Sequence, residues 1–145
     1  MPTGDRHDPV PGFHFAVEIS SIVVAGFSEV SGLNAEIEVQ EFREGGVNEY
    51  MHKRLGPVKY PSNLILKKGI TDNTELWDWY RKVMRGTKDR RLVSVVLMNS
   101  EGQEVRRWKL QNAFPVKWTG PDMKASASEV AVETLELAHE GLTPQ

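Results

Sequence analysis

The stretch "NLILKKGITDNTELWDWYRKVMRG", Asn63–Gly86, contains both of the patterns that decide the fold class. Leu64 and Leu66 lie on one face of an alternating run, which is typical of a β-strand. We expect a helix after this strand, over residues 73–85, because apolar residues recur there at helical spacing. These residues are Leu76, Tyr80, Val83 and Met84, with Trp77 beside them.

Both ends of this helix carry sequence signals. Asp72 is expected to cap the N-terminus, and Glu75, three residues later, completes a pair that resembles a capping box. Gly86 is well placed to end the helix, because glycine readily adopts the left-handed conformation of a C-terminal cap. Cations in the last turns suit the negative end of the helix dipole. They are Arg81, Lys82 and Arg85.

Strand patterns occupy most of the rest of the chain. Apolar and polar residues alternate over residues 13–20, and a tight turn near Ser20 is expected to pair this run with the next. In the last run the apolar phase changes between Val132 and Leu135, which predicts a β-bulge or burial on both faces. The expected strands cover residues 13–20, 22–30, 34–42, 63–70, 91–99, 104–112, 113–118 and 128–141, with a turn at residues 100–102.

These elements predict a mainly β, α+β fold in a single domain over residues 1–145. The expected architecture is two packed antiparallel sheets that form a β-sandwich or partial barrel, with one α-helix at the edge. A net charge of −2 gives no global basic field to hold nucleic acid or an anionic membrane. The absence of cysteine excludes disulfides and thiolate chemistry.

The N-terminal residues 1–12 are polar and rich in proline, and they predict a flexible arm. They lack the charged and then apolar pattern of a signal peptide. No apolar run approaches the roughly 18 residues of a membrane span. We therefore expect a protein that is made in the cytoplasm, is not exported by the general route and does not insert directly into a membrane.

The sequence predicts no catalytic, cofactor-binding or metal site. Gly45 and Gly46, with Lys53 and Arg54 downstream, lack the spacing of a phosphate-binding loop. Ser28 is not followed by the glycine and the helix that a nucleophile elbow requires. No two histidines have the i, i+4 spacing of a helical metal pair. The histidines are His7, His14, His52 and His139.

A basic cluster lies at the end of the expected helix and just beyond it. It could bind nucleic acid, form a solvated helix rim, or pair with an acidic patch of a neighbouring copy, such as Glu36, Glu38 and Glu41. The residues alone leave these three interpretations open. The cluster consists of Arg81, Lys82, Arg85, Lys88, Arg90 and Arg91.

Residues 41–63 form a polar stretch between two strand patterns. Disorder is a poor explanation, because Val47, Tyr50, Met51 and Leu55 are apolar or aromatic side chains that need somewhere to pack. An arm that packs only on another subunit would explain both its polarity and these side chains.

Several segments, in order and over nearly the whole chain, resemble the tail tube proteins of contractile phages and related contractile injection systems. There are two departures: Phe42 stands where the family usually has Tyr, and "KRLGPVKYPSN" varies the usual Lys-Leu-Pro-Gly stretch. The segments are "FHFAVEI", "AGFSEVSGL", "EFREGGVNEY", "YPSNLILKKGITDNTELWDWY" and "NAFPVKWTGPDMKASASEVAVETLELAHEGL".

This resemblance implies the fold of the secreted hexameric ring protein of type VI systems. It implies that six copies form a ring, that neighbouring sheets join into an inner barrel, and that rings stack into a rigid tube. The implied partners are other copies of the chain, a contractile sheath, baseplate or spike proteins and tube-terminating proteins. Protein cargo or DNA would occupy the lumen, and the tube would be part of an assembled particle, a virion in the case of a phage.

Within this framework, Ile37 and Val39 are expected to face the core, while Glu36, Glu38 and Gln40 face polar space, as candidates for the lumen. Residues 44–60 are expected to form an extended inter-subunit loop. Its candidate contact residues are Glu44, Gly45, Gly46, Asn48, Tyr50, His52, Lys53, Arg54 and Tyr60.

The favoured hypothesis is a structural inner-tube subunit without catalysis, belonging to a contractile injection system. A phage tail tube that conveys DNA is one alternative. A monomeric β-barrel with a closed apolar pocket for a small ligand is another, from a different class of protein.

Overall fold

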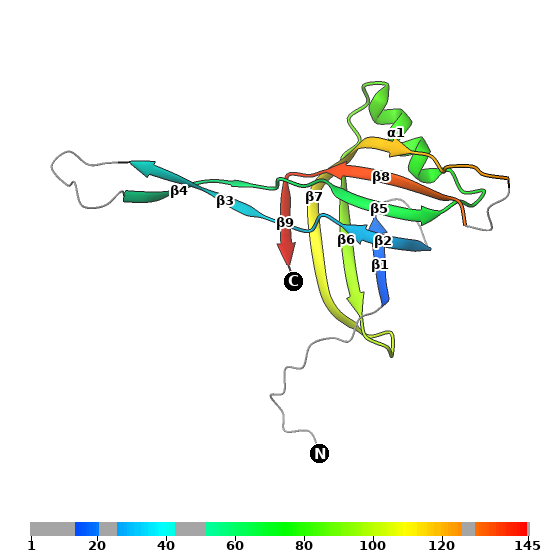
Figure 1. Cartoon of the computed structure of the whole chain (residues 1–145), viewed down its shortest axis with the longest axis horizontal. Coiled ribbons are helices and arrows are strands. Elements are labelled where there is room, and N and C mark those ends of the chain that lie inside the picture. The colour runs from blue at the N-terminus through cyan, green and yellow to red at the C-terminus, as the bar shows by residue number, and fades with distance from the viewer. Residues whose placement is uncertain (1–13, 21–25, 43–51, 126–129, 145) are drawn as a thin grey trace, which may run out of the picture.

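Strand β7 (Glu104–Thr119) is shared by two antiparallel sheets and sets the layout of the protein (Figure 1). The structure is a computed structural model, and it describes residues 14–20, 26–42, 52–125 and 130–144. In the first sheet, the first half of β7 pairs with β6 and with β9, and β6 also pairs with β1. These strands are β1 (His14–Ile19), β6 (Arg91–Met98) and β9 (Gly141–Pro144).

The second half of β7 belongs to the other sheet. There it pairs with β8 (Val132–Ala138), which pairs with β5 (Leu64–Gly69), which in turn pairs with β2 (Phe27–Ser31). The two sheets pack face to face, and the described strands do not close into a barrel. The predicted β-sandwich or partial barrel with one helix is therefore confirmed for the described part of the chain.

The change from one sheet to the other takes place at Asn112. This residue has φ 51°, in the left-handed region that asparagine tolerates better than most residues. The pairing with β6 shifts register at the same point. The two strands predicted over residues 104–112 and 113–118 are therefore one strand, because Asn112 bends the chain without interrupting it.

The predicted pairing of the first strand is wrong. β1 pairs with β6, with Val17 opposite Val95, whereas the next described strand, β2, pairs with β5 in the other sheet. The expected partner was the run over residues 22–30, of which residues 22–25 lie outside the described residues. Pairing with β6, whose residues 93–96 are buried, places Val17 and Ile19 of β1 in the same core cluster as Val93 and Val95.

The core lies between the sheets and beneath the helix. Trp79 of the helix is almost fully buried, and its indole Nε1 donates a hydrogen bond to the Asp89 carbonyl at 2.8 Å. Burial of an aromatic side chain together with a satisfied polar group contributes strongly to stability. The other apolar members of the buried cluster are Val17, Ile19, Leu64, Leu66, Leu76, Val93, Val95, Leu110, Ala113, Leu135 and Leu137.

Helix α1 (Glu75–Met84) confirms the predicted helix, but its start differs from the prediction. Asp72 does not cap it; instead the Asn73 side-chain oxygen accepts a hydrogen bond from the Glu75 amide at 2.8 Å. Asparagine next to the first turn performs this task because its short side chain reaches the free amides there. Gly86 follows the helix at φ 93°, which confirms its predicted role at the end.

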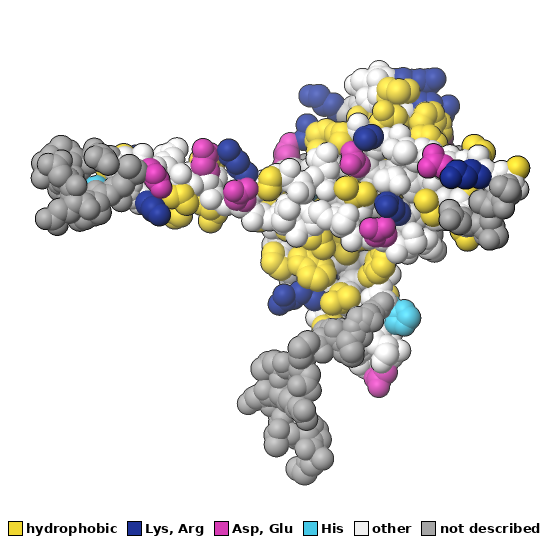
Figure 2. Space-filling model, in the orientation of Figure 1, with side chains coloured by type: hydrophobic (Ala, Val, Ile, Leu, Met, Phe, Trp, Pro, Cys, Tyr) yellow, Lys and Arg dark blue, Asp and Glu magenta, His cyan; other side chains and the backbone are white. Residues whose placement is uncertain are grey.

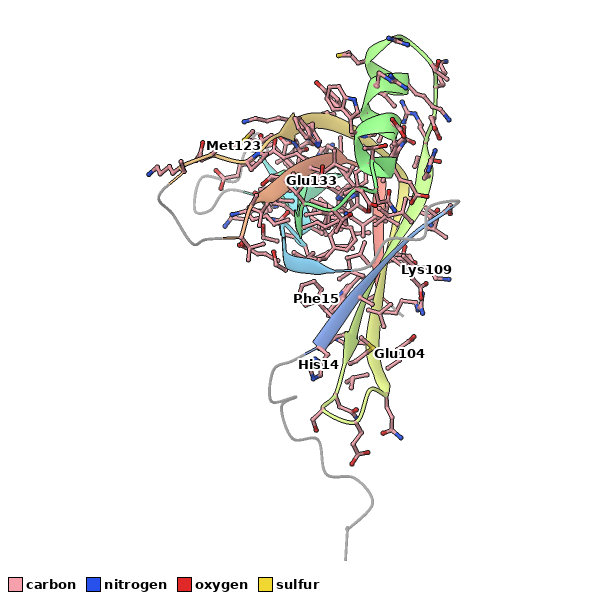
Figure 3. All side chains as sticks on the ribbon, turned by 90° about the vertical axis from the view of Figure 1, so that its right-hand side faces the viewer. His14, Phe15, Glu104, Lys109, Met123 and Glu133 are labelled. Carbon is pink, nitrogen blue, oxygen red and sulfur yellow. The ribbon has the colours of Figure 1, made fainter. Side chains whose placement is uncertain are left out.

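A buried ion pair explains the change of phase in the last strand pattern. β8 pairs with β5 in continuous register, so the predicted bulge is absent there, and Glu133 shares the buried phase of Leu135 and Leu137. The Glu133 carboxylate lies 3.8 Å from Lys68 Nζ and accepts a hydrogen bond from Trp118 Nε1 at 2.9 Å. Figure 3 shows Glu133 within the body of the protein.

We predict that Glu133→Leu lowers the free energy of unfolding by about 3–5 kcal/mol, because it leaves the Lys68 ammonium buried without its partner. The double variant Lys68→Met/Glu133→Leu should recover most of this loss, since no uncompensated charge remains. Urea denaturation of the two variants and the wild type measures the difference. Equal destabilisation in the single and double variants would contradict this account.

Candidate assembly surface

Strands β3 (Glu36–Phe42) and β4 (His52–Lys59) form a two-stranded sheet of their own. The hairpin projects from one end of the body (Figure 1), and every side chain of β3 is exposed. An isolated two-stranded ribbon is only marginally stable in water, and it needs a further surface to pack on. This hairpin is therefore the described part of the chain that most requires a partner.

The predicted burial of Ile37 and Val39 in the core is wrong. Their side chains are 49% and 54% exposed, because β3 pairs only with β4 and covers no part of the core. The expected extended loop over residues 44–60 is also partly a strand, since residues 52–59 form β4. The rest of the connection between the two strands, residues 43–51, lies outside the described residues.

One face of the hairpin is aliphatic. Ile37 is paired with Val58 and Val39 with Leu55, and directly opposed residues of an antiparallel pair lie on the same face. These four residues, called the apolar face below, are all exposed, Leu55 to 78%. Figure 2 shows hydrophobic side chains gathered along one edge of the hairpin. Because none of the four is covered by the body, the apolar face is available to another surface.

A bulge at Gly56 and Pro57 makes this face continuous. The register shifts between Ile37 and Val39, so that Val58 and Leu55 lie on one face although they are three residues apart. A side chain at Gly56 would place its Cβ 2.7 Å from the Glu38 carbonyl oxygen, which is closer than atoms can pack. Proline, which cannot donate a ladder hydrogen bond, is tolerated at a bulge.

The opposite face of the hairpin is polar. Gln40 is paired with Arg54, and Lys59 Nζ lies 3.2 Å from the Glu38 carboxylate. The Arg54 guanidinium also lies over the Phe42 ring at 4.6 Å. Exposed pairs of this kind contribute only about 0–1 kcal/mol each to the free energy of unfolding. Their charges therefore keep this face hydrated but add little to the stability of the hairpin.

The structure brings most of the described candidate residues together on this hairpin. Glu36, Glu38 and Gln40 share the exposed polar face, and whether that face lines a lumen stays a prediction. His52, Lys53 and Arg54 lie on β4, while Tyr60 lies at the base of the hairpin. The other expected contact residues, Glu44, Gly45, Gly46, Asn48 and Tyr50, lie outside the described residues.

Three short-range contacts lie at the base of the hairpin. Asn34 Nδ2 donates a hydrogen bond to Ser62 Oγ at 2.9 Å, which joins the two chain segments that enter and leave the hairpin. The Tyr60 ring lies 5.1 Å from the His139 ring, between centroids. The third contact is the close approach of the Gly32 backbone to the Asn63 carbonyl. The direction in which the hairpin leaves the body is fixed by this small set of groups.

Gly32 allows two backbone segments to approach closely at this base. It has φ 96°, and a Cβ at this position would lie 2.0 Å from the Asn63 carbonyl oxygen. Only glycine fits both the left-handed conformation and the close approach.

We predict that Gly32→Ala lowers the free energy of unfolding by about 1–3 kcal/mol more than a matched control, because the chain must move to relieve the overlap. The control is Gly102→Ala, which also has a positive φ of 81° but open space around the added Cβ. Chemical denaturation of both variants gives the comparison. Equal losses would show that the close approach carries no cost.

His139 gives the hairpin base a dependence on pH. Burial lowers the pKa of His139 below its ordinary value of 6.5, because the charged imidazolium loses solvation there. The unfolded chain then binds a proton more readily than the folded chain. The stability linked to His139 is therefore complete above about pH 6.5 and is lost as the pH falls through and below that value.

We predict that the free energy of unfolding falls between about pH 6.5 and pH 5, above the range in which ordinary carboxylates titrate. In His139→Gln this part of the pH dependence should be reduced, since glutamine does not titrate. Denaturant titrations of both proteins across this range measure the slopes. Identical slopes would show that His139 does not carry the effect.

Several residues of the predicted basic cluster form ion pairs with acidic residues of the same chain. Arg90 forms an ion pair with Glu140, and Arg91 lies 2.8 Å from the Asp89 carboxylate. The hydrogen bond from Arg91 holds the pKa of Asp89 below its usual value. Arg81 lies 3.7 Å from the Asp78 carboxylate. Three of the six residues therefore form ion pairs within the chain, which fits a solvated helix rim.

Among the described residues, no group of three or more His, Asp or Glu side chains is placed to hold a metal ion.

Comparison with protein families shows which family the chain belongs to. The family model described as T4-like virus tail tube protein gp19 matches residues 11–143. The chain belongs to this tail tube family. It is a structural tube subunit of the phage-tail-like type, and the resemblance inferred from the sequence segments is confirmed. A search of curated proteins found no match to the chain.

Solved structures with similar chains include parts of the anti-feeding prophage and of an extracellular contractile injection system. A chain in the cryo-EM structure of the anti-feeding prophage (AFP) baseplate, 6-fold symmetrised, is 27% identical with a TM-score of 0.83, over 97% of both chains. A chain of the extracellular contractile injection system PVC sheath–tube complex in the extended state is 28% identical, TM-score 0.83, covering 94% of this chain and 91% of that one. Hcp1 from Flavobacterium johnsoniae, at 15% identity and TM-score 0.52 over 91% and 94%, shows the same fold.

The apolar face is the feature of the candidate surface that sequence reasoning missed. The alternation in residues 36–42 was recognised, but its apolar half was assigned to the core. The signal that could have corrected this is the second run, residues 52–59, which follows a connection containing Gly45 and Gly46 and can pair with the first as a hairpin.

No helix within the described ranges is long and apolar enough to cross a membrane.

Proposed function

We propose that this chain is the inner-tube subunit of a contractile injection system, in which hexameric rings stack into a hollow tube. The observation that carries the proposal is the projecting hairpin with its uncovered apolar face, on a chain of the tail tube family. A surface of this kind costs free energy in water, and covering it with another copy of the chain recovers that free energy. The subunit performs no catalysis; its task is rigid self-assembly.

Free sheet edges support self-assembly as well. Within the described residues, β1 pairs only with β6, β9 only with β7, and β2 only with β5, so each of the three leaves one edge without a strand partner. Unpaired edges readily accept a strand from another chain. In a ring these edges become contacts between neighbours, whereas in a monomer they favour aggregation.

We extend the proposal to the partners that similar chains have. The relatives' structures are described as a sheath–tube complex, a baseplate and a tube-terminating cap. We propose that this tube is likewise enclosed by a sheath, starts at a baseplate or spike and ends at a terminating protein. Protein cargo passes through a polar lumen and is delivered when the tube is driven through a target envelope, and the subunit acts as part of an assembled particle.

The competing ligand-binding β-barrel fits the structure poorly. That function requires a closed barrel around an apolar pocket, and the described strands form an open sandwich whose interior is filled by side chains. A phage tail tube that conveys DNA remains the nearer alternative, and the genes beside this one separate it from an injection system.

We predict that Leu55→Asp abolishes tube formation without unfolding the subunit. The charge removes the apolar contact, while a substitution at a side chain 78% exposed changes the free energy of unfolding by no more than about 0.5 kcal/mol. Negative-stain microscopy and size-exclusion chromatography distinguish tubes from a 16.4 kDa monomer.

The matched control is Gln40→Asp, which places the same charge on the polar face of the hairpin and should leave assembly largely intact. Normal tubes from Leu55→Asp would show that the apolar face is not an assembly contact.

A further inference from the structure

A small aromatic pocket opens beside the start of helix α1. The half-buried indole rings of Trp77 and Trp118 form two of its walls, with centroids 4.9 Å apart and an interplanar angle of 63°. The volume of the pocket is about 270 Å³. The other lining residues are Ile70, Thr71, Asn73, Thr74 and Glu133. The pocket thus combines two aromatic walls with one carboxylate.

The Glu133 carboxylate has one oxygen that lacks a hydrogen bond from the described residues. Glu133 is only 6% exposed, and Figure 3 shows it beside helix α1. Trp118 Nε1 donates to its Oε2, but no described residue donates a hydrogen bond to Oε1. Lys68 Nζ lies 3.8 Å from Oε1, beyond hydrogen-bonding distance, and it bonds to Thr71 Oγ1 instead. Because a buried oxygen without a donor costs free energy, a ligand with N–H groups is favoured here.

The charge at the opening of the pocket favours a cation. No basic residue lines the pocket, and Lys68 behind it balances the charge of Glu133. Asp72 and Glu75 adjoin the lining residues, are exposed and form no ion pair within the described part of the chain. The positive end of the α1 dipole opposes a cation, but Glu75 and Asp78 in the first turn offset this effect. An acidic opening over aromatic walls selects a cation over an anion.

Among the cations of proteins, a guanidinium group fits the pocket best. It is flat, so it can stack on an indole ring, and its N–H groups lie in its own plane, from which they can reach a carboxylate oxygen. An ammonium group is a strongly hydrated point charge and gains less from aromatic walls. The arrangement of two indoles and one carboxylate is therefore suited to arginine.

The size of the pocket indicates a single side chain rather than a free small molecule. Sites that enclose a small-molecule ligand have volumes of roughly 300–1,000 Å³, and this pocket is smaller. A side chain that fills a pocket in this way is a common anchor of protein–protein contacts, and arginine is one of the residues most often found in that role.

We propose that the pocket between Trp77 and Trp118 binds an arginine side chain of a partner protein. The guanidinium lies against the indoles and donates a hydrogen bond to Glu133 Oε1. None of the lining residues belongs to the β3–β4 hairpin or to the edge strands β1, β2 and β9, so assembly through those surfaces leaves the pocket open to a protein other than a copy of this chain. This last step rests on the proposed function, whereas the guanidinium site itself is complete within one subunit.

The guanidinium site can be tested on the folded subunit by NMR, because each of the four tryptophans gives one indole N–H signal. The probe is N-acetyl-arginine methylamide, and the control probe is N-acetyl-citrulline methylamide, which has nearly the same shape without the charge. The arginine probe should shift the Trp77 and Trp118 signals saturably and leave those of Trp79 and Trp108 in place. The citrulline probe should bind about tenfold more weakly.

Variants of one wall provide the second measurement. Trp77→Leu should weaken binding of the arginine probe about tenfold, whereas Trp77→Phe, which keeps an aromatic wall, should retain most of the affinity. If Trp77→Leu does not fold, the comparison of the two probes on the wild type decides. Equal binding of both probes, unchanged affinity in folded Trp77→Leu, or shifts of all four signals without saturation would overturn the inference.

The same titration of assembled tubes, followed by tryptophan fluorescence, identifies the kind of partner. Unchanged affinity for the arginine probe would show that the pocket stays open for a different protein. Loss of binding on assembly would show that a neighbouring copy fills the pocket, and it would overturn that part of the inference. Failure of the folded chain to form rings or tubes would contradict the proposed function, while the titration of the subunit would still decide the guanidinium site.

Discussion

The shared strand β7 is the constraint on which the rest of the structure depends. Because its two halves pair in different sheets, the bend at Asn112 turns the sheets toward each other and closes the core between them. Among the described strands of the body, β6, β8 and β9 pair directly with β7. β1 pairs with β6, β5 pairs with β8, and β2 pairs with β5. The β3–β4 hairpin pairs with none of these strands, and for this reason it has no part in the core.

This arrangement divides the described chain into a body with a buried core and a hairpin without one. The body buries a continuous apolar cluster, while the hairpin exposes the four residues of its apolar face to solvent. An apolar patch limited to one narrow ribbon and flanked by charges is small enough for a subunit to stay in solution before it assembles. The same patch is large enough to favour docking once a complementary surface is close.

The sequence predicted those features of the fold that depend on local pattern. The helix, its end at Gly86, the buried phase of Leu64 and Leu66 and the turn before β7 all follow from spacing and from the conformational preferences of single residues. The errors concern features that depend on distant partners. Alternation showed that Ile37 and Val39 share a face, but it carries no information on what covers that face. The partner of β1 and the bend at Asn112 were missed because both depend on how the two sheets meet.

The same limit applies to the candidate site. Its polar face was predicted because alternation alone identifies it, whereas its apolar face was assigned to the wrong partner. The buried position of Glu133 was missed because a carboxylate in a strand pattern is ordinarily read as solvent-exposed, and only the register with β5 places Lys68 opposite it. In both cases the missing information was the identity of the facing surface, rather than the conformation of the strand.

If the hairpin docks on a second copy, affinity and symmetry are determined by different parts of the chain. The apolar face supplies the buried area, but a heterologous contact closes into a ring only when the angle between successive copies is correct. That angle depends on the direction in which the hairpin leaves the body. The close approach of Gly32 to Asn63, the Asn34–Ser62 hydrogen bond and the contact of Tyr60 with His139 set this direction. Changes at the base should therefore alter the geometry of the assembly, whereas changes on the apolar face should alter how strongly it forms.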